Sequence, residues 1–285
     1  MHWTPARTGG RLRRRDQAIT PSADFRGATA HAVSVTPVVG LPLFRAGDDL
    51  AGAIGEALAR ADMPLHDGDV LVVAQKVVSK VEDRAVPVRT VVARPEAVDL
   101  AARSLKDPAV AELMLRESQE IVRVVPGVVI TRHRTGHVLA NAGIDASNVP
   151  KGEAGEAVLL WPEDPDASAR RLRSALGARF GARIAVVISD SLGRAWRMGT
   201  TGHAIGVAGL KPLRDRRGET DLFGRELQAT LIGVADEIAA AASLVMGEAA
   251  EGVPAAVVRG AVFVADEADE GVGELIRPLA QDLFR

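Results

Sequence analysis

The 285-residue sequence contains no cysteine and few aromatic residues. The lack of cysteine excludes disulfides, thiolate metal sites and a cysteine nucleophile, and it agrees with a reducing compartment. Aromatic residues make up 3% of the chain, whereas 47% of it is hydrophobic, so the core must consist of Val, Ile, Leu and Ala. This composition suits helices packed on a valine-rich sheet, and we expect an α/β protein.

Long apolar runs and an excess of one charge are also missing. No run is long enough to span a bilayer, and no apolar segment of signal-peptide length follows the arginines near the N-terminus, which favours a cytoplasmic protein. The formal net charge is −2, so neither nucleic acid nor a membrane is expected as a partner.

Three common nucleotide and metal motifs are absent as well. The sequence has no G-x-x-x-x-G-K-[ST] phosphate loop, no G-x-G-x-x-G dinucleotide turn and no H-E-x-x-H zinc helix. A familiar NTPase or dehydrogenase is therefore disfavoured.

The periodicity of the chain divides it into a tail and one folded unit. Residues 1–33 lack periodicity, and we expect a disordered N-terminal tail there, followed by a single domain over residues 34–285. Strands are predicted at residues 70–74, 121–125, 128–131, 137–141, 184–189 and 254–258. Helices are predicted at residues 50–61, from Pro95, from Asp107 toward Glu120, from Asp166 to Phe180, near the C-terminus and, as the longest, from about Gly224 to Met246.

Two stretches place acidic and amide residues after predicted strands, where α/β proteins form ligand clefts. In AGIDASNVPKG, Asp145, Ser147 and Asn148 can bind Mg²⁺ or Mn²⁺ through oxygen, or can form an Asx turn or helix cap. In VVISDSLGRAWRMG, Asp190 and Ser191 come directly off a strand, and a carboxylate beside a hydroxyl can share a divalent ion.

Two arginines follow the second stretch. Arg194 and Arg197 can clamp phosphate or carboxylate oxygens, which together with a metal ion suits phosphoryl transfer. The alternative is that Asp190 caps a turn, Trp196 packs and the arginines are solvated.

Other polar residues have two interpretations each. Asp221 and Glu226 either extend the acidic group or cap the long helix. Lys76 and Lys80, in a loop after the strand at 70–74, either reach a phosphate or are solvated. His203, in a Gly-rich loop, is either structural or catalytic, and zinc is disfavoured.

Nine segments in order resemble the coenzyme F420:L-glutamate ligase family (F420 gamma-glutamyl ligases): VVGLPLFRAGDDL, GDVLVVAQKVVSKVE, LKDPAVAELMLRES, NAGIDASNV, ISDSLGRAWRMG, AIGVAGL, DLFGRE, VADEIAAAASLVMGE and PAAVVRG. They run from about Val35 to Gly260, and we expect the stand-alone form without the nitroreductase-like domain of some relatives. The resemblance implies an F420 ligase-type α/β fold of mixed sheets with packed helices, and an intertwined homodimer with a cleft for GTP and divalent ions.

The resemblance also implies a reaction and a set of residues. GTP would phosphorylate the terminal carboxylate of the deazaflavin coenzyme F420 precursor, and the amino group of L-glutamate would attack the acyl phosphate. Further rounds would build a poly-γ-glutamate tail. The implied ligands of Mn²⁺ or Mg²⁺, with a K⁺ requirement left open, are Asp145, Asp190, Ser191 and Glu248. The implied nucleotide contacts are Leu41, Pro42, Leu43, Phe44, Gln75, Lys80 and Asn148.

Charge and position alone add Arg194 and Arg197 as candidate catalytic residues. Two other interpretations stay open. One is a related NTP-dependent amide ligase acting on a different carboxylate. The other is a non-catalytic nucleotide- or coenzyme-binding protein.

Overall fold

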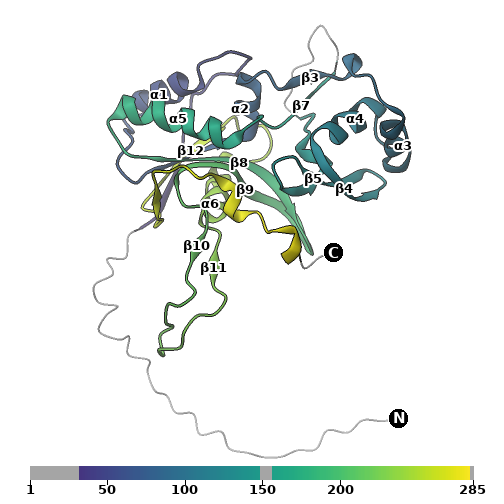
Figure 1. The fold of residues 1–285 in the computed structure, drawn as a ribbon. Helices are drawn as coiled ribbons and strands as arrows, with labels where there is room; N and C mark the ends of the chain where they lie inside the picture. The colour runs from purple at the N-terminus through teal and green to yellow at the C-terminus, as the bar shows by residue number, and fades with distance from the viewer. Residues whose placement is uncertain (1–31, 148–155, 283–285) are drawn as a thin grey trace, which may run out of the picture.

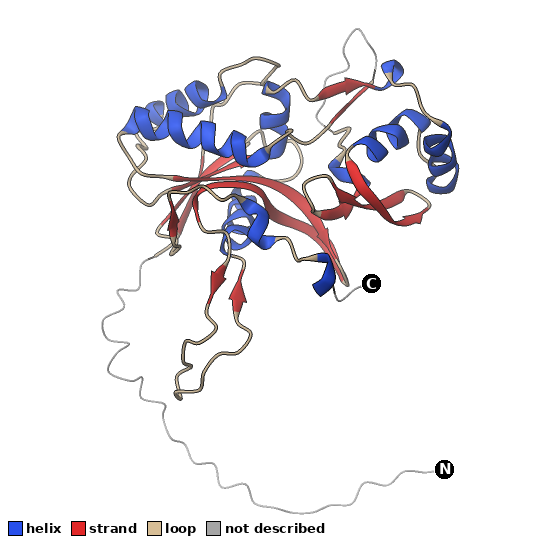
Figure 2. Ribbon diagram, viewed as in Figure 1, coloured by secondary structure: helices blue, strands red, loops and turns tan. Residues whose placement is uncertain are grey.

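A mixed six-stranded sheet forms the centre of the protein in a computed structural model that describes residues 32–147 and 156–282 (Figures 1 and 2). Nearly all of the expected N-terminal tail, and Asn148, lie outside the described residues. In spatial order the strands are β1 (Ser34–Pro37), β12 (Ala255–Arg259), β2 (Val70–Ala74), β8 (Ala185–Arg194), β9 (Arg197–Leu210) and β13 (Ala265–Asp266). Only β2 and β8 run parallel, and the other neighbours are antiparallel.

Helices cover both faces of this sheet, which explains its continuous valine runs. Leu71 and Val73 of β2 belong to a core beneath α1 (Leu50–Arg60), α2 (Gln75–Val81) and α5 (Pro165–Phe180). Val70 and Val72 point to the opposite face and join a second core with α6 (Val234–Met246). Figure 1 shows α1 and α5 above the sheet and α6 below it.

A small lobe lies beside the main sheet (Figure 1). Its strands are antiparallel and pack with two helices around a separate core: β4 (Ser118–Val125), β5 (Val128–His133), β6 (Val138–Ala140), α3 (Pro95–Ser104) and α4 (Pro108–Arg116). The antiparallel pair β3 (Ala85–Pro87) and β7 (Ala157–Leu159) connects the lobe to the body. Four short 3-10 turns complete the described chain: Val88–Thr90, Asn141–Gly143, Val272–Leu275 and Leu279–Gln281.

An arm projects from the body between β9 and α6 (Figure 1). Its base is the antiparallel pair β10 (Arg214–Asp215) and β11 (Leu231–Ile232). Near its tip, Leu222 and Phe223 are 67% and 75% exposed.

The α/β class and most predicted elements are confirmed. Asp107 caps α4 by accepting hydrogen bonds from the Ala109 and Val110 amides, with proline next in sequence as expected. The Gly181 backbone is left-handed and ends α5. Among the described residues, no helix has both the length and the apolar character needed to cross a membrane.

Four predictions about where helices begin, end or occur were wrong. The expected loop after Ala74 is the helix α2. The expected C-terminal helix is replaced by 3-10 turns. Helix α4 ends at Arg116 rather than near Glu120. The long helix begins at Val234 instead of Gly224, because Gly233 interrupts the helical pattern and the preceding residues pair with β10.

Candidate functional site

The parallel pair of strands brings two distant segments to one edge of the sheet. Ala74 at the end of β2 lies opposite Ser189 of β8. The chain then enters α2, which carries Lys76, while β8 continues into Asp190. Parallel strands end at the same edge, so the lysine and the carboxylate come together there although 114 residues apart in sequence, as their numbers show.

Asp145 reaches this edge from the small lobe. Its backbone exchanges two hydrogen bonds with Leu159, at 3.1 and 2.7 Å. Its carboxylate lies 2.7 Å from the Lys76 Nζ and accepts the Ser147 amide at 2.6 Å, and Lys76 also donates to the Ser147 hydroxyl at 2.8 Å. The hydrogen bond from the Ser147 amide to the Asp145 carboxylate forms an Asx turn, which was the alternative interpretation of this stretch. Burial alone would raise the pKa of Asp145, but Lys76 and Ser147 outweigh it and lower the pKa.

Asp190 is held by N–H donors. Its Oδ2 accepts a hydrogen bond from the Trp161 indole Nε1 at 2.8 Å, and its Oδ1 accepts the Ser191 amide at 2.8 Å. Burial raises the pKa of Asp190 to about 6, against the opposing effect of these donors and of Lys76. No lysine or arginine in the described ranges forms an ion pair with this carboxylate, so its charge is only partly compensated.

Glu248 joins the group from the other side of the sheet. Helix α6 ends at Met246 with Gly247 as its C-cap, and the exposed Glu248 follows. The Ser191 hydroxyl donates to the Glu248 carboxylate at 2.6 Å. The structure therefore connects the four predicted metal ligands in pairs, with Asp145 near Asp190 and Ser191 bound to Glu248. We call these four residues the edge site: Asp145, Asp190, Ser191 and Glu248.

The chemistry of the edge site fits a divalent ion shared with a phosphate. Carboxylate and hydroxyl oxygens are the ligands that Mg²⁺ and Mn²⁺ prefer. Within the described residues, no three His, Asp or Glu side chains are arranged to hold a metal ion by themselves. Mg²⁺ usually binds through one or two carboxylates with water and substrate phosphates, and the edge site is compatible with such a partial set of protein ligands.

The predicted nucleotide contacts have different surroundings. Lys80 is half-buried near the edge site, where burial and then the charge of Lys76 lower its pKa while Asp145 opposes them. Gln75 is buried, and its amide donates to the Ser79 hydroxyl at 2.6 Å, whereas its Oε1 has no partner among the described residues.

The segment formed by Leu41, Pro42, Leu43 and Phe44 runs from the surface into the core. Leu43 is 93% exposed and Phe44 only 6% exposed. A role for this segment in nucleotide binding stays a prediction.

The two candidate arginines lie at the far end of the β8–β9 hairpin. Arg194 pairs in register with Arg197. Four residues of strand separate Arg194 from Asp190, which corresponds to roughly 13 Å. A catalytic role for either arginine stays a prediction, and their side chains would have to reach back along the hairpin.

Three further candidates lie elsewhere than expected. Asp221 accepts the amides of Phe223 and Arg225 in a turn of the arm, and Glu226 forms a β-bridge with Thr220. Both therefore belong to the arm, and neither caps α6. His203 lies on β9 opposite Asp190 rather than in a loop.

Sequence reasoning missed Trp161. It follows an apolar run just after β7, a pattern that indicates packing and nothing more. Its hydrogen-bond partner lies 29 residues away on another strand, and no local pattern points to such a contact.

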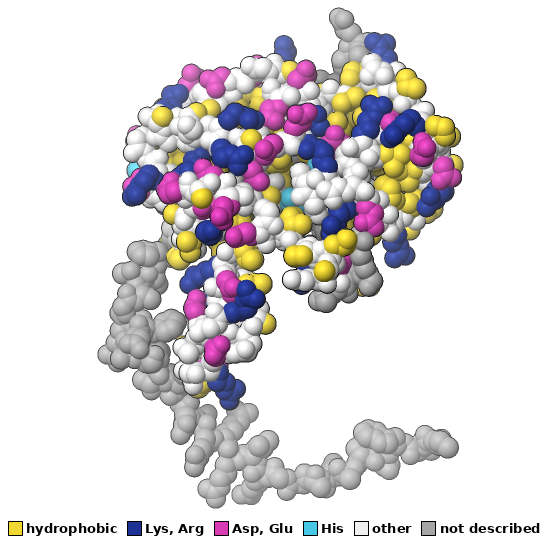
Figure 3. Space-filling model, in the orientation of Figure 1, with side chains coloured by type: hydrophobic (Ala, Val, Ile, Leu, Met, Phe, Trp, Pro, Cys, Tyr) yellow, Lys and Arg dark blue, Asp and Glu magenta, His cyan; other side chains and the backbone are white. Residues whose placement is uncertain are grey.

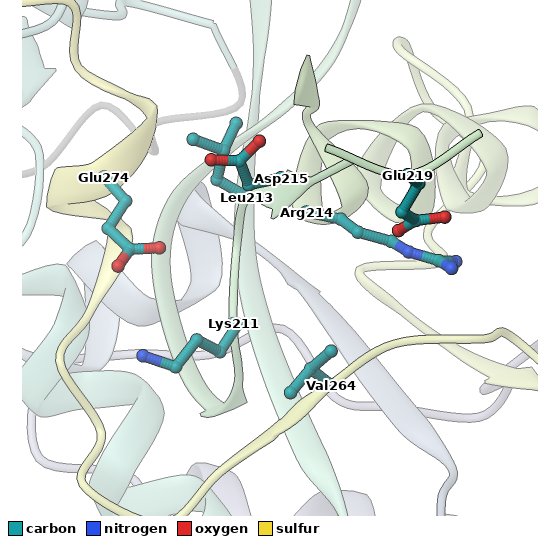
Figure 4. Close-up of a pocket in the computed structure, with 7 residues that line it drawn as sticks. All are labelled: Lys211, Leu213, Arg214, Asp215, Glu219, Val264 and Glu274. Atoms are coloured by element: carbon teal, nitrogen blue, oxygen red, sulfur yellow. The ribbon is translucent and has the colours of Figure 1, made fainter. Parts of the chain in front are cut away.

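A separate hollow of about 650 Å³ lies at the base of the arm, away from the edge site (Figure 4). Its walls carry both signs of charge, and none of the predicted site residues lines it: Lys211, Leu213, Arg214, Asp215, Glu219, Val264 and Glu274. Acidic and basic side chains are likewise intermixed over the face of the molecule in Figure 3. We assign no ligand to this hollow.

Comparison with known proteins identifies the family. The model of the F420-0:gamma-glutamyl ligase family matches residues 39–260. The chain belongs to this family. It is 47% identical over 253 residues to the coenzyme F420:L-glutamate ligase of Methanothermobacter thermautotrophicus, covering 89% of this chain and 99% of the relative.

Two more archaeal relatives support the assignment, and both are also named coenzyme F420:L-glutamate ligase. The protein of Methanocaldococcus jannaschii is 42% identical, over 86% of this chain and 94% of the relative. The protein of Methanopyrus kandleri is 45% identical, over 85% of this chain and 93% of the relative. The resemblance that the nine motifs indicate is confirmed.

Proposed function

We propose that this protein is a GTP-dependent ligase that joins L-glutamate to the coenzyme F420 precursor through an acyl phosphate, and that it acts as a homodimer. The observation that carries the proposal is the edge site. In a member of this ligase family, it comprises three carboxylates and a hydroxyl, with two lysines beside them at the same edge of the sheet.

The edge site suits the first half-reaction. The γ-phosphoryl group of GTP passes to a carboxylate oxygen of the precursor, and GDP leaves. Two anions must approach each other in this step, so their charge has to be offset. Asp145, Asp190, Ser191 and Glu248 would hold the Mn²⁺ or Mg²⁺, which would neutralise phosphate charge, while Lys80 would bind the phosphates directly.

The second half-reaction forms the amide bond. The amine of L-glutamate attacks the acyl carbon, phosphate leaves, and the new amide forms as the amine loses a proton. Repetition on the γ-carboxylate of the product would lengthen the tail. Arg194 and Arg197 would bind a carboxylate of the acceptor from the hairpin, because a guanidinium fork matches carboxylate oxygens.

The arm supports the proposed homodimer. It extends away from the body of its own chain (Figure 1) and exposes Leu222 and Phe223 near its tip. Exposed apolar side chains on a projecting element are typical of surfaces that pack against another protein.

A mass-spectrometric assay tests the reaction. The purified chain is incubated with GTP, Mn²⁺, L-glutamate and the glutamate-free precursor. We expect GDP, phosphate and a product heavier by one glutamyl unit. GDP release without this mass gain would contradict the proposed acceptor, and replacement of the precursor by other carboxylic acids would then identify a related amide ligase.

A further inference from the structure

The indole of Trp161 is built tightly against the edge site. Its side chain is fully buried, and its Nε1 lies 2.8 Å from the Asp190 Oδ2. Gly143 makes this approach possible, because a Cβ at that position would lie 2.5 Å from the indole Nε1. Any other residue at 143 would therefore push the ring away from the carboxylate.

The small lobe fixes the orientation of the same ring. The His133 and His137 rings pack against it, with centroids 4.7 and 5.4 Å from the indole. The Thr135 hydroxyl lies 2.9 Å from the Nδ1 of each histidine and ties the two together. The Arg84 Nε donates to the Trp161 carbonyl at 2.8 Å. Both the ring and the backbone of Trp161 are thus held, and the N–H cannot turn elsewhere.

We propose that Trp161 is a positioning residue that orients the Asp190 carboxylate for a divalent ion. An indole N–H only donates hydrogen bonds, so it can fix a carboxylate but cannot bind the metal. Trp161 donates a hydrogen bond to Oδ2 and the Ser191 amide donates one to Oδ1. The carboxylate plane is therefore fixed, and the lone pairs that do not accept these hydrogen bonds point in one direction. This inference rests on the proposed metal-binding role of Asp190.

Metal affinity provides the first test. Partners that orient a metal ligand typically contribute about 10- to 100-fold to affinity. Trp161→Phe keeps an aromatic ring between the histidines and removes the N–H. Mn²⁺ is titrated into the full-length wild type and variant with GDP present, and free Mn²⁺ is measured by electron paramagnetic resonance. We expect the Mn²⁺ dissociation constant of the variant to rise about tenfold.

Two controls separate this inference from the proposed function. Trp196→Phe changes a 91% exposed tryptophan at the hairpin tip, and its Mn²⁺ affinity should equal that of the wild type. Asp190→Asn should lose Mn²⁺ binding. If it keeps the wild-type affinity, the metal site is misassigned. If it loses Mn²⁺ and Trp161→Phe does not, the role of Trp161 alone is wrong.

The Mn²⁺ dependence of the rate separates positioning from general support of the fold. A positioning role predicts that Trp161→Phe needs about tenfold more Mn²⁺ for half-maximal rate and nearly recovers kcat at saturating Mn²⁺. An equal loss of rate at every Mn²⁺ concentration, with circular dichroism showing partial unfolding, would contradict the proposal.

Discussion

Two carboxylates, Asp190 in the edge site and Glu117 in the small lobe, differ in how their charge is offset. Burial alone would raise the pKa of Glu117, but the nearby His133 ring and the hydrogen-bonded Arg134 and Arg84 lower it to about 2. Burial raises the pKa of Asp190 to about 6, and this carboxylate has only N–H donors and a nearby lysine to oppose it. Glu117 is therefore already paired with cationic side chains. Asp190 has no such pair among the described residues, so a metal cation could still bind to it.

The difference separates a structural from a functional carboxylate. Glu112 repeats the structural pattern: burial is outweighed by Arg116 and Arg94, and its pKa falls to about 2. Glu112 and Glu117 are each paired with two arginines, whereas Asp145, the other aspartate of the edge site, is paired among the described residues with the single Lys76. A buried carboxylate without a cation costs stability unless a ligand repays it, and such perturbed groups cluster at functional sites.

The largest expected effect is the loss of ligase activity in Asp190→Asn. Removing a charge that holds the metal should remove several kcal/mol of transition-state stabilisation and lower kcat/KM by about 10³-fold or more. The measurement is the initial rate of amide formation. The control is Asp99→Asn, which changes an exposed surface pair on α3 and should leave the rate within about twofold. Comparable losses in both variants would refute a special role for Asp190.

The next effect concerns the stability of the small lobe. Glu117→Gln removes a carboxylate that is 11% exposed and paired with arginines, and we expect it to lower the free energy of unfolding by about 3 kcal/mol. The matched control is Glu163→Gln, which changes the second acidic partner of Arg84, an 81% exposed carboxylate, and should cost less than about 1 kcal/mol. Urea denaturation measures both. Similar losses would contradict the comparison.

The ion pairs of Glu117 also predict that the free energy of unfolding depends on pH in the acid range. Glu117 has a pKa of about 2 when folded and 4.5 as its ordinary value. Its stabilisation is therefore complete above pH 4.5 and is lost as the pH falls toward 2. The difference in unfolding free energy between wild type and Glu117→Gln should shrink over this range. A difference that stays constant between pH 7 and pH 3 would show that Glu117 is not ionically paired.

A smaller effect is expected at Lys80. Lys80→Met removes the proposed phosphate contact but keeps an aliphatic chain in the half-buried position. We expect KM for GTP to rise about tenfold, which corresponds to the loss of about 1.4 kcal/mol, while stability changes little. Steady-state kinetics over a range of GTP concentrations measure it. An unchanged KM would place the nucleotide elsewhere.

Local sequence patterns predicted much of the fold because they report local physics. The valine runs predicted β2, β8 and β12, and the Asp107 cap with its proline predicted the start of α4. The prediction failed where a helical spacing of leucines coincided with the arm, since Leu231 is half-exposed and pairs as a strand. Hydrophobic periodicity cannot say whether a segment has a surface to pack on.

The edge site was predictable in part. The residues Asp145 and Asp190 stood out because each follows a predicted strand, but Asp145 reaches Asp190 from the small lobe through its bridge to Leu159, and Asp190 itself lies within β8. The indole contact of Trp161 was not predictable, because it depends on how the small lobe is placed against the main sheet. The resemblance to the family supplied Glu248, for which the residues alone gave no signal.

The most direct test of the central claim is the pH dependence of unfolding for metal-free wild type and Asp190→Asn. The pKa of Asp190 is about 6 when folded and 3.8 ordinarily, so the folded state binds this proton more tightly. The wild type should therefore gain about 1 kcal/mol relative to the variant between pH 8 and pH 5. Excess Mn²⁺ with GDP at pH 8 should stabilise the wild type alone. The account would be contradicted if the difference in unfolding free energy between wild type and Asp190→Asn did not change with pH. Equal stabilisation of both proteins by Mn²⁺ with GDP would also contradict it.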